Sequence, residues 1–299
     1  MPELPEVETL RSDLSREVVG KKIKAVTVDN GRWVRRHKSA KAFRDLLEGQ
    51  SIKAVERVGK YLLLPLDSGN TLVIHLGMSG QLHRAKTPKT PKIKHTHIVF
   101  GFTQGGELWF VDPRTFGEAF VSVPLSEAAQ ADLQLSDSVV NAEARVLRRR
   151  ISELHELGFD PVESMLTWEQ FGYFLHHKPV QLKAFLMDQH TIAGIGNVYS
   201  DEILFAAGLR YDRLSSSLST TEVRRLYRAL VEILAEAIKH RGSSLADEQY
   251  RDLEGKTGNF SQFHEVYDRA GLACRRCRNT VQKVKWKDRN TYFCDHCQI

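Results

Sequence analysis

Residues 1–11 read MPELPEVETLR, so the chain opens with two prolines and three acids. Pro5 suits the first turn of a helix, where its missing N–H costs nothing, and acidic side chains there complement the helix dipole. Apolar residues then recur at helical spacing, at Val7, Leu10, Leu14 and Val18. Gly20 follows as a stop signal. The stretch therefore predicts an amphipathic N-terminal helix, which accounts for neither Pro2 nor Glu3.

After this helix, the pattern changes to strands up to about residue 123. KIKAVTV at 22–28 alternates apolar and polar residues. YLLLPLDSGNTLVIHL at 61–76 and HIVFGFTQGGELWFV at 97–111 each read as two strands around a turn. We predict a β-sandwich with the first helix packed on it, forming a domain over 1–135.

Helical signals begin near residue 125 and are clearest in STTEVRRLYRALVEILAEAIKHRG at 219–242. Ser219 and Glu222 are spaced as a capping box before an apolar stripe. We predict a helical core over 165–241 within a domain at 136–265. The polar, glycine-bearing stretch that starts at Gly242 predicts a long exposed loop, a type that is often functional.

All four cysteines lie in two C-x-x-C pairs with sixteen residues between them: Cys274, Cys277, Cys294 and Cys297. The segments VQKVKW and NTYF lie between the pairs and read as the strands of a hairpin. This spacing predicts one Zn²⁺ held by four thiolates in a β-hairpin domain at 266–299, and four protein ligands indicate a structural site. A redox C-x-x-C of the thioredoxin type would require a βαβ setting, which is the weaker interpretation.

Lys and Arg number 43 against 37 Asp and Glu, a net charge of +6 that favours a polyanionic partner. The basic residues form two clusters, at 32–44 and 84–94, and residues 268–299 are also basic. Any one cluster is better explained by a solvated face, but three clusters separated in the sequence are harder to explain in that way. No stretch approaches the ~20 apolar residues of a membrane span, and no signal-peptide pattern is present. We therefore expect a cytoplasmic protein that does not associate with membranes.

Five motifs occur in the order found in bacterial formamidopyrimidine-DNA glycosylases: MPELPEVET, HLGMSG at 75–80, DPRTFG at 112–117, GIGNVYSDEILFAAGL at 194–209 and the C-x-x-C pairs. The chain resembles this family over nearly its whole length. The resemblance implies an α+β multi-domain fold: an N-terminal β-sandwich with a packed helix, a helix–two-turn–helix domain and a four-cysteine zinc β-hairpin, with DNA between the halves. It also implies a monomer that acts in base excision repair at the nucleoid, on double-stranded DNA carrying oxidised purines (8-oxoguanine and formamidopyrimidines).

In this family the nucleophile is an N-terminal proline. Removal of Met1 would make Pro2 a terminal secondary amine, and α-amino groups titrate near ~8, well below the ~10.4 of lysine. Attack on C1′ would expel the base and leave an iminium ion, which permits elimination of both phosphates. Glu3 resembles the acid that protonates the sugar ring oxygen, while Lys60 and Arg289 match a lysine and an arginine at the phosphates. Without the resemblance, Lys60 and Arg289 would read as surface residues.

The other site residues implied by the resemblance contact DNA. Met78, Arg114 and Phe116 match the residues that fill the gap left by the flipped nucleotide. Further matches to DNA-contacting positions are His75, His95, Asn197, Lys178 and, in the loop that closes over the lesion, Lys256. Two positions depart from the family pattern: Thr96 stands where an aspartate is common, and Thr115 where a base is common.

Two alternatives remain. An endonuclease VIII-like glycosylase for oxidised pyrimidines usually has glycine at the position of Leu4 and lacks the Arg114 and Phe116 equivalents. A non-catalytic zinc DNA-binding protein would explain the charge and the cysteines. It would have no use for Pro2 and Glu3 beside Lys60.

Overall fold

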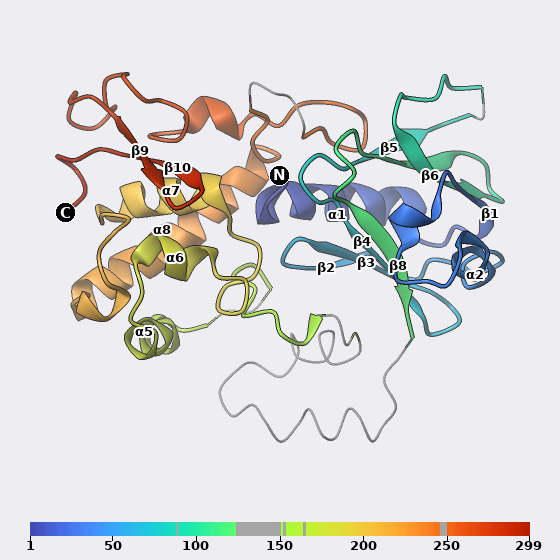
Figure 1. Cartoon of the computed structure of the whole chain (residues 1–299), viewed down its shortest axis with the longest axis horizontal. Coiled ribbons are helices and arrows are strands. Elements are labelled where there is room, and N and C mark those ends of the chain that lie inside the picture. The colour runs from blue at the N-terminus through green and yellow to red at the C-terminus, as the bar shows by residue number, and fades with distance from the viewer. Residues whose placement is uncertain (88, 124–150, 152–153, 164–165, 246–249) are drawn as a thin grey trace.

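The computed structural model describes residues 1–87, 89–123, 151, 154–163, 166–245 and 250–299. Two halves are joined through the N-terminal helix α1 (Leu4–Val18), which lies between the strands and the helices in Figure 1. The domain boundary predicted at 135/136, and the helical signals predicted from residue 125 to 150, lie outside the described residues.

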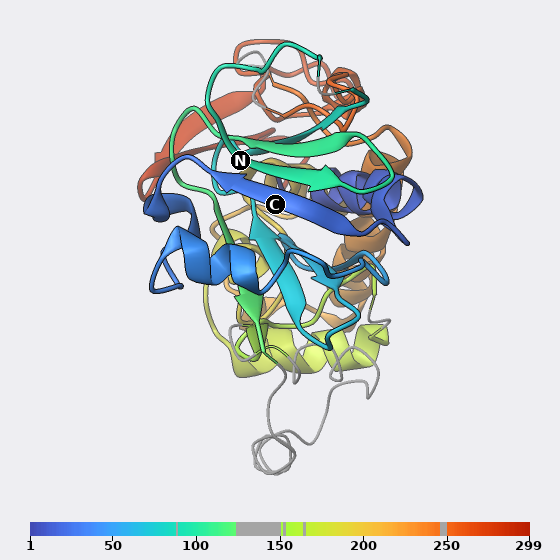
Figure 2. The same ribbon diagram turned by 90° about the vertical axis from the view of Figure 1, so that its right-hand side faces the viewer.

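The N-terminal half is a sandwich of two antiparallel sheets, seen as two layers of strands in Figure 2. One sheet has the order β1 (Ile23–Val28), β6 (Thr96–Phe102), β7 (Glu107–Val111), β5 (Gln81–Ala85). The other has the order β2 (Glu56–Val58), β3 (Tyr61–Pro65), β4 (Thr71–His75), β8 (Glu118–Ser122). A 3₁₀ helix η1 (Gly31–Val34) and a short helix α2 (Ala40–Asp45) follow β1. The strands predicted at 22–28, 61–76 and 97–111 are confirmed.

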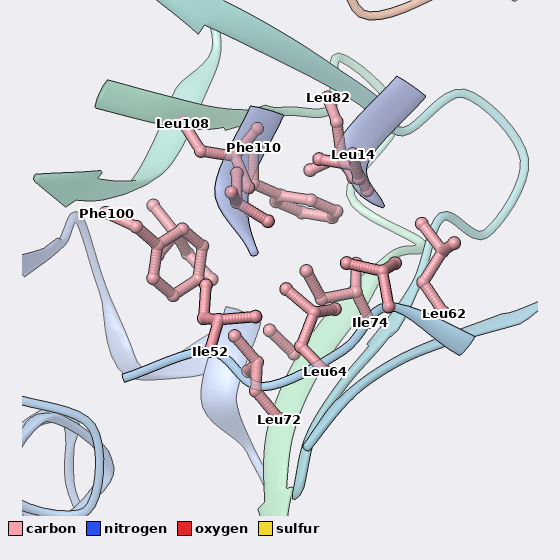
Figure 3. Packing of buried hydrophobic residues seen from close by; sticks show 14 of the residues in the cluster. Leu14, Ile52, Leu62, Leu64, Leu72, Ile74, Leu82, Phe100, Leu108 and Phe110 are labelled. Carbon is pink, nitrogen blue, oxygen red and sulfur yellow. The ribbon is translucent and has the colours of Figure 1, made fainter. Parts of the chain in front are cut away.

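The core lies between the two sheets and α1 (Figure 3). Leu62 and Leu64 alternate with Leu63 along β3, so the first two enter the main core while Leu63 joins a second cluster on the opposite face. On α1, Leu10 and Leu14 lie in the main core. Burial of this apolar face is the principal force that holds the helix on the sandwich.

The described part of the C-terminal half contains four α-helices: α5 (Trp168–His177), α6 (Leu182–Met187), α7 (Asn197–Ala207) and α8 (Thr220–Lys239). Two 3₁₀ helices are also present there, η3 (Ser215–Ser217) and η4 (Phe260–Phe263). The predicted capping box of α8 is confirmed, because the Ser219 hydroxyl accepts from the Glu222 amide and the Glu222 carboxylate accepts from the Ser219 amide at 2.8 Å. Both interactions satisfy amides that the first helical turn would otherwise leave free.

The described part of the stretch after Gly242 differs from the exposed loop predicted by its polar composition. Ser243, Tyr250 and Leu253 are all less than 8% exposed, and Tyr250 and Leu253 belong to the sandwich core. The segment therefore returns from the helical half to the sandwich and packs there. Single apolar residues in a polar stretch gave too weak a pattern to predict this burial.

The C-terminal hairpin consists of β9 (Gln282–Trp286) and β10 (Arg289–Phe293), as predicted. It is attached to α7 through Asp201, which accepts from the Thr291 hydroxyl at 2.6 Å and from the Tyr292 amide at 2.9 Å. Lys183 of α6 donates to the same carboxylate at 2.6 Å. Among the described residues, no helix combines the length and apolar character required to cross a bilayer.

Candidate active site

The N-terminus meets the start of α7, where the two halves touch. Glu3 is 3% exposed, and its carboxylate accepts from the amides of Gly196 at 2.7 Å and Val198 at 3.0 Å. These amides belong to the positive end of a helix, which binds anions. A Cβ at position 196 would lie 2.5 Å from the carboxyl carbon of Glu3, so this approach requires glycine. The GIGN motif thus acts as a receptor for the Glu3 carboxylate.

Glu6 holds the backbone of Glu3 from the other side. Its Oε2 accepts from the Glu3 amide at 2.7 Å, while Oε1 accepts from the Tyr199 hydroxyl at 2.5 Å and the Ser243 amide at 2.7 Å. Burial, together with the charge of Glu3, raises the pKa of Glu6. Glu6 is therefore a buried junction between α1, α7 and the segment that follows α8. One pocket at this junction is lined by Met1, Pro2, Glu3, Glu6, Val198, Ser243, Leu245 and Tyr250.

Lys60 lies in the turn between β2 and β3 and is 8% exposed. Its Nζ donates to the carbonyl of Ile195, directly before Gly196, at 3.2 Å. Burial lowers the pKa of Lys60; Glu3 acts in the opposite direction, and the positive charge of Arg289 lowers the pKa further. A buried amine near the N-terminus and α7 differs from the solvated lysine that position 60 would suggest without the resemblance.

The turn that carries Lys60 is anchored by a buried ion pair. Arg57 donates to Asp160 at 2.5 Å, and the Gly59 amide donates to the same carboxylate at 2.8 Å. Arg57 also donates to Glu8 of α1 at 2.8 Å. The sequence analysis missed these residues because no local pattern connects Asp160 with a strand one hundred positions earlier.

Arg289 and Asn197 lie at the junction of α7 and the hairpin. Asn197 is the first residue of α7 and donates to the Asn290 carbonyl at 3.0 Å. Arg289 begins β10, and its half-exposed guanidinium lies 3.6 Å from Asp288. The hairpin thus brings Arg289 toward the site from the C-terminal end of the chain.

Met78 and Phe116 lie on adjacent turns at the end of the sandwich and are 36% and 50% exposed. The Arg114 guanidinium carbon is 5.7 Å from the centre of the Phe116 ring. Asp112 organises both turns: Oδ1 accepts from the Ser79 hydroxyl at 2.6 Å, and Oδ2 from the Gly117 amide at 2.8 Å. Exposed apolar tips on rigid turns are suited to insertion into a base stack.

The remaining predicted DNA contacts have varied surroundings. His75 packs on Tyr61, and burial, reinforced by Lys60, lowers its pKa to about 4. His95 is exposed and has a φ of 66°. Lys178 pairs with Asp188, and the exposed Lys256 pairs with Glu254 at 2.9 Å. The assignments of these residues to DNA stay predictions.

The four cysteine sulfurs lie within 4.8 Å of one another. The Sγ atoms of Cys274 and Cys297 are 3.9 Å apart, and those of Cys277 and Cys294 are 3.4 Å apart. A tetrahedral zinc ion with Zn–S bonds of ~2.3 Å places its sulfurs about 3.8 Å apart, so this donor set fits the ion.

Comparisons with known proteins agree with this geometry. Sequence models match the formamidopyrimidine-DNA glycosylase N-terminal domain over residues 1–119, its H2TH domain over 157–249, and the zinc finger found in FPG and IleRS over 271–299. The formamidopyrimidine-DNA glycosylase of Pelotomaculum thermopropionicum is 36% identical over 298 residues, covering 100% of this chain and 99% of the relative. The chain belongs to the formamidopyrimidine-DNA glycosylase family. The resemblance noted from the five motifs is confirmed.

Solved structures of formamidopyrimidine-DNA glycosylases share the whole fold. The MutM (Fpg) protein from Thermus thermophilus superposes with a TM-score of 0.81 at 36% identity, covering 99% of this chain and 98% of that one. The Lactococcus lactis Fpg in complex with DNA containing an abasic site gives 0.83 at 30% identity, with 99% of each chain covered. The predicted fold class is thus confirmed, and the four-cysteine cluster is a structural zinc site.

Proposed function

We propose that this chain is a bifunctional DNA glycosylase and AP lyase that removes oxidised purines from double-stranded DNA. The observation that carries this proposal is the meeting of Pro2, Glu3 and Lys60 at the start of α7. The relatives are named formamidopyrimidine-DNA glycosylase, and the structure of the L. lactis enzyme has been solved with DNA containing Fapy-dG. A DNA substrate also favours a cytoplasmic monomer associated with the nucleoid.

The chemistry begins at the amine of Pro2 once Met1, which is exposed, has been removed. The amine nitrogen bonds to C1′ as the glycosidic bond breaks, and the base leaves with the electron pair and takes up a proton. The Glu3 carboxylate takes up the proton that the amine loses and delivers it to the ring oxygen as the sugar opens. The resulting iminium ion acidifies C2′–H, so the 3′ and then the 5′ phosphate are eliminated.

The remaining side chains position the DNA. Lys60 and Arg289 approach the phosphates beside the lesion, with Asn197, His75, His95 and Lys178 along the backbone. Met78, Arg114 and Phe116 fill the space left by the flipped nucleotide, and Lys256 belongs to the segment that covers the lesion. We propose domain limits of 1–135, 136–265 and 266–299, supported by family matches that each fall inside one range.

Borohydride trapping tests this function. The mature protein is incubated with a duplex carrying 8-oxoguanine opposite cytosine, reduced, and the adduct is mapped by mass spectrometry. We expect a covalent adduct on Pro2, which Pro2→Gly and protein retaining Met1 do not form. An adduct formed only with an oxidised pyrimidine would indicate the endonuclease VIII-like function. Tight duplex binding with no adduct on any lesion would indicate a non-catalytic DNA-binding protein.

A further inference from the structure

A chain of buried polar side chains leads away from Glu6 into the helical half. The Tyr199 hydroxyl that donates to Glu6 lies 3.3 Å from Oγ of Ser243. That Oγ lies 2.9 Å from Nε2 of His264, which directly follows η4. The four residues come from α1, α7, the segment after α8 and the segment after η4. None of them is more than 7% exposed.

At its other end, this series of hydrogen-bonded side chains reaches the backbone next to the proposed nucleophile, Pro2. Glu6 accepts the amide hydrogen of Glu3 at 2.7 Å, and Glu3 directly follows Pro2. An unbroken series of hydrogen bonds therefore connects the His264 ring with the backbone that carries the Pro2 amine. The zinc cysteines and the Lys60 turn take no part in this series.

The His264 ring is neutral within this series. Burial lowers the pKa of His264 to about 4, so its ring is neutral at pH 7. Nε2 of His264 and the Ser243 hydroxyl share one hydrogen bond, and the Tyr199 hydroxyl beside Ser243 donates to Glu6. The Glu6 carboxylate is then the final acceptor. Such a series is strongest when every member has a partner, and loss of one member leaves a buried group unsatisfied.

The His264 ring is also fixed by its neighbours. Its centre lies 5.7 Å from that of Phe260 and 5.7 Å from that of Tyr267, with both pairs edge to face. Phe260 packs in turn on Tyr199 at 5.8 Å. A ring held in this way presents Nε2 to Ser243 in one orientation, which is what a positioning role requires.

We propose that His264 and Ser243 are positioning residues for the Pro2 amine, acting through the Tyr199 hydroxyl and the Glu6 carboxylate. This inference rests on the proposed function, because it concerns the same site. Neither residue bonds to the substrate. They fix the rotamer of Glu6 and hence the backbone at Glu3, which sets the direction of attack on C1′.

The test compares His264→Leu, which removes the ring nitrogens, with His264→Gln, whose amide replaces Nε2. Single-turnover excision of 8-oxoguanine and the Kd for a lesion duplex are measured on the zinc-loaded full chain. We expect His264→Leu to lower the excision rate by ~10- to 100-fold, as misplacement of a reacting group by a fraction of an ångström does, with Kd changed less than ~3-fold. We expect His264→Gln to recover most of the rate.

A double-mutant cycle is completed by Ser243→Ala and by the double variant His264→Leu/Ser243→Ala. Because both residues act through one series of hydrogen bonds, the double variant should be no slower than the slower single variant. Tyr227→Phe is the control: it removes a hydroxyl that donates to the Leu166 carbonyl in the helical half, away from Glu6, and should keep the wild-type rate.

Full activity of His264→Leu, equal losses in His264→Leu and His264→Gln, or multiplicative losses in the double variant would each overturn the inference. Ser243→Ala keeps the test valid if His264→Leu does not fold, since it deletes one oxygen atom. Wild-type protein that excises no lesion would instead refute the proposed function.

Discussion

The carboxylate of Glu3 lies 2.7 Å from the amide of Gly196, although the two residues are 193 positions apart in the chain. This contact aligns the residue next to the proposed nucleophile with the positive end of α7. It also brings the sandwich and the helical half into one site. The approach is so close that a single methyl group on Gly196 would overlap the carboxyl carbon.

Gly196→Ala should therefore displace Glu3. We expect single-turnover excision to fall at least ~10-fold and the free energy of unfolding to fall by about 1–3 kcal/mol, as is usual for overpacking. Urea unfolding and excision assays measure the two effects. Gly31→Ala is the matched control, because a Cβ there meets no atom within 4 Å. Equal behaviour of the two variants would contradict the steric argument.

Lys60→Met should separate stability from activity. The buried amine has a lowered pKa, so its charge opposes folding at pH 7, and stability should rise with pH toward the ordinary value of 10.5. Gln189 also donates to the Ile195 carbonyl at 2.8 Å, so that acceptor stays satisfied in the variant. We expect a thermal midpoint equal to wild type or ~2 °C higher, with strand cleavage reduced ~10-fold or more. The exposed Lys24, changed to Met, should alter neither.

Asp112→Ala should impair the turns that carry Arg114 and Phe116. Loss of the bonds to Ser79 and Gly117 leaves both turns less ordered. We expect excision of 8-oxoguanine opposite cytosine to fall ~10-fold, while the Kd for undamaged duplex changes little. Fluorescence anisotropy and single-turnover assays provide these measurements. A change of similar size in Asp45→Ala, on the exposed helix α2, would argue for a general effect of charge.

Removal of zinc should unfold the hairpin and leave the sandwich intact. The thiolates hold the two ends of residues 274–297 together, and small metal domains unfold without their ion. After chelation we expect the metal content to fall to zero, hydrogen exchange to rise in β9 and β10 but not in β3 and β4, and duplex affinity to fall ~10-fold or more, because Arg289 is no longer held. Unchanged duplex affinity in zinc-free protein would contradict the role of Arg289.

The titration of His264 should appear in the pH dependence of stability. Burial lowers its pKa from the ordinary 6.5 to about 4, and Arg275 and Arg269 act in the same direction. Between these values the unfolded chain binds the extra proton, so acidification through this range destabilises the fold. Relative to His264→Gln, wild type should lose about 2–3 kcal/mol between pH 7 and pH 4. The free energy of unfolding is measured by urea denaturation at each pH. An equal change in this free energy for the two proteins between pH 7 and pH 4 would contradict the prediction.

Elements with strong local signals could be predicted from the sequence. The capping box at Ser219 and the two C-x-x-C pairs mark α8 and the zinc hairpin, because caps and metal ligands are short-range patterns. The junction at Glu6 could not be predicted, because its partners Tyr199 and Ser243 are ordinary residues that only the folded chain brings together. Asp112 stood inside a quoted motif, yet its role depends on hydrogen bonds that the motif does not reveal.

The anchoring of Glu3 by amides from residue 196 onward has a consequence during synthesis. A ribosome that has completed only the sandwich has produced the terminal amine, but not the helix that receives its neighbouring carboxylate. Incomplete chains therefore carry the proposed nucleophile without the helix that orients its neighbour. In such an arrangement, an activity that cuts the genome is withheld until the whole polypeptide has been made.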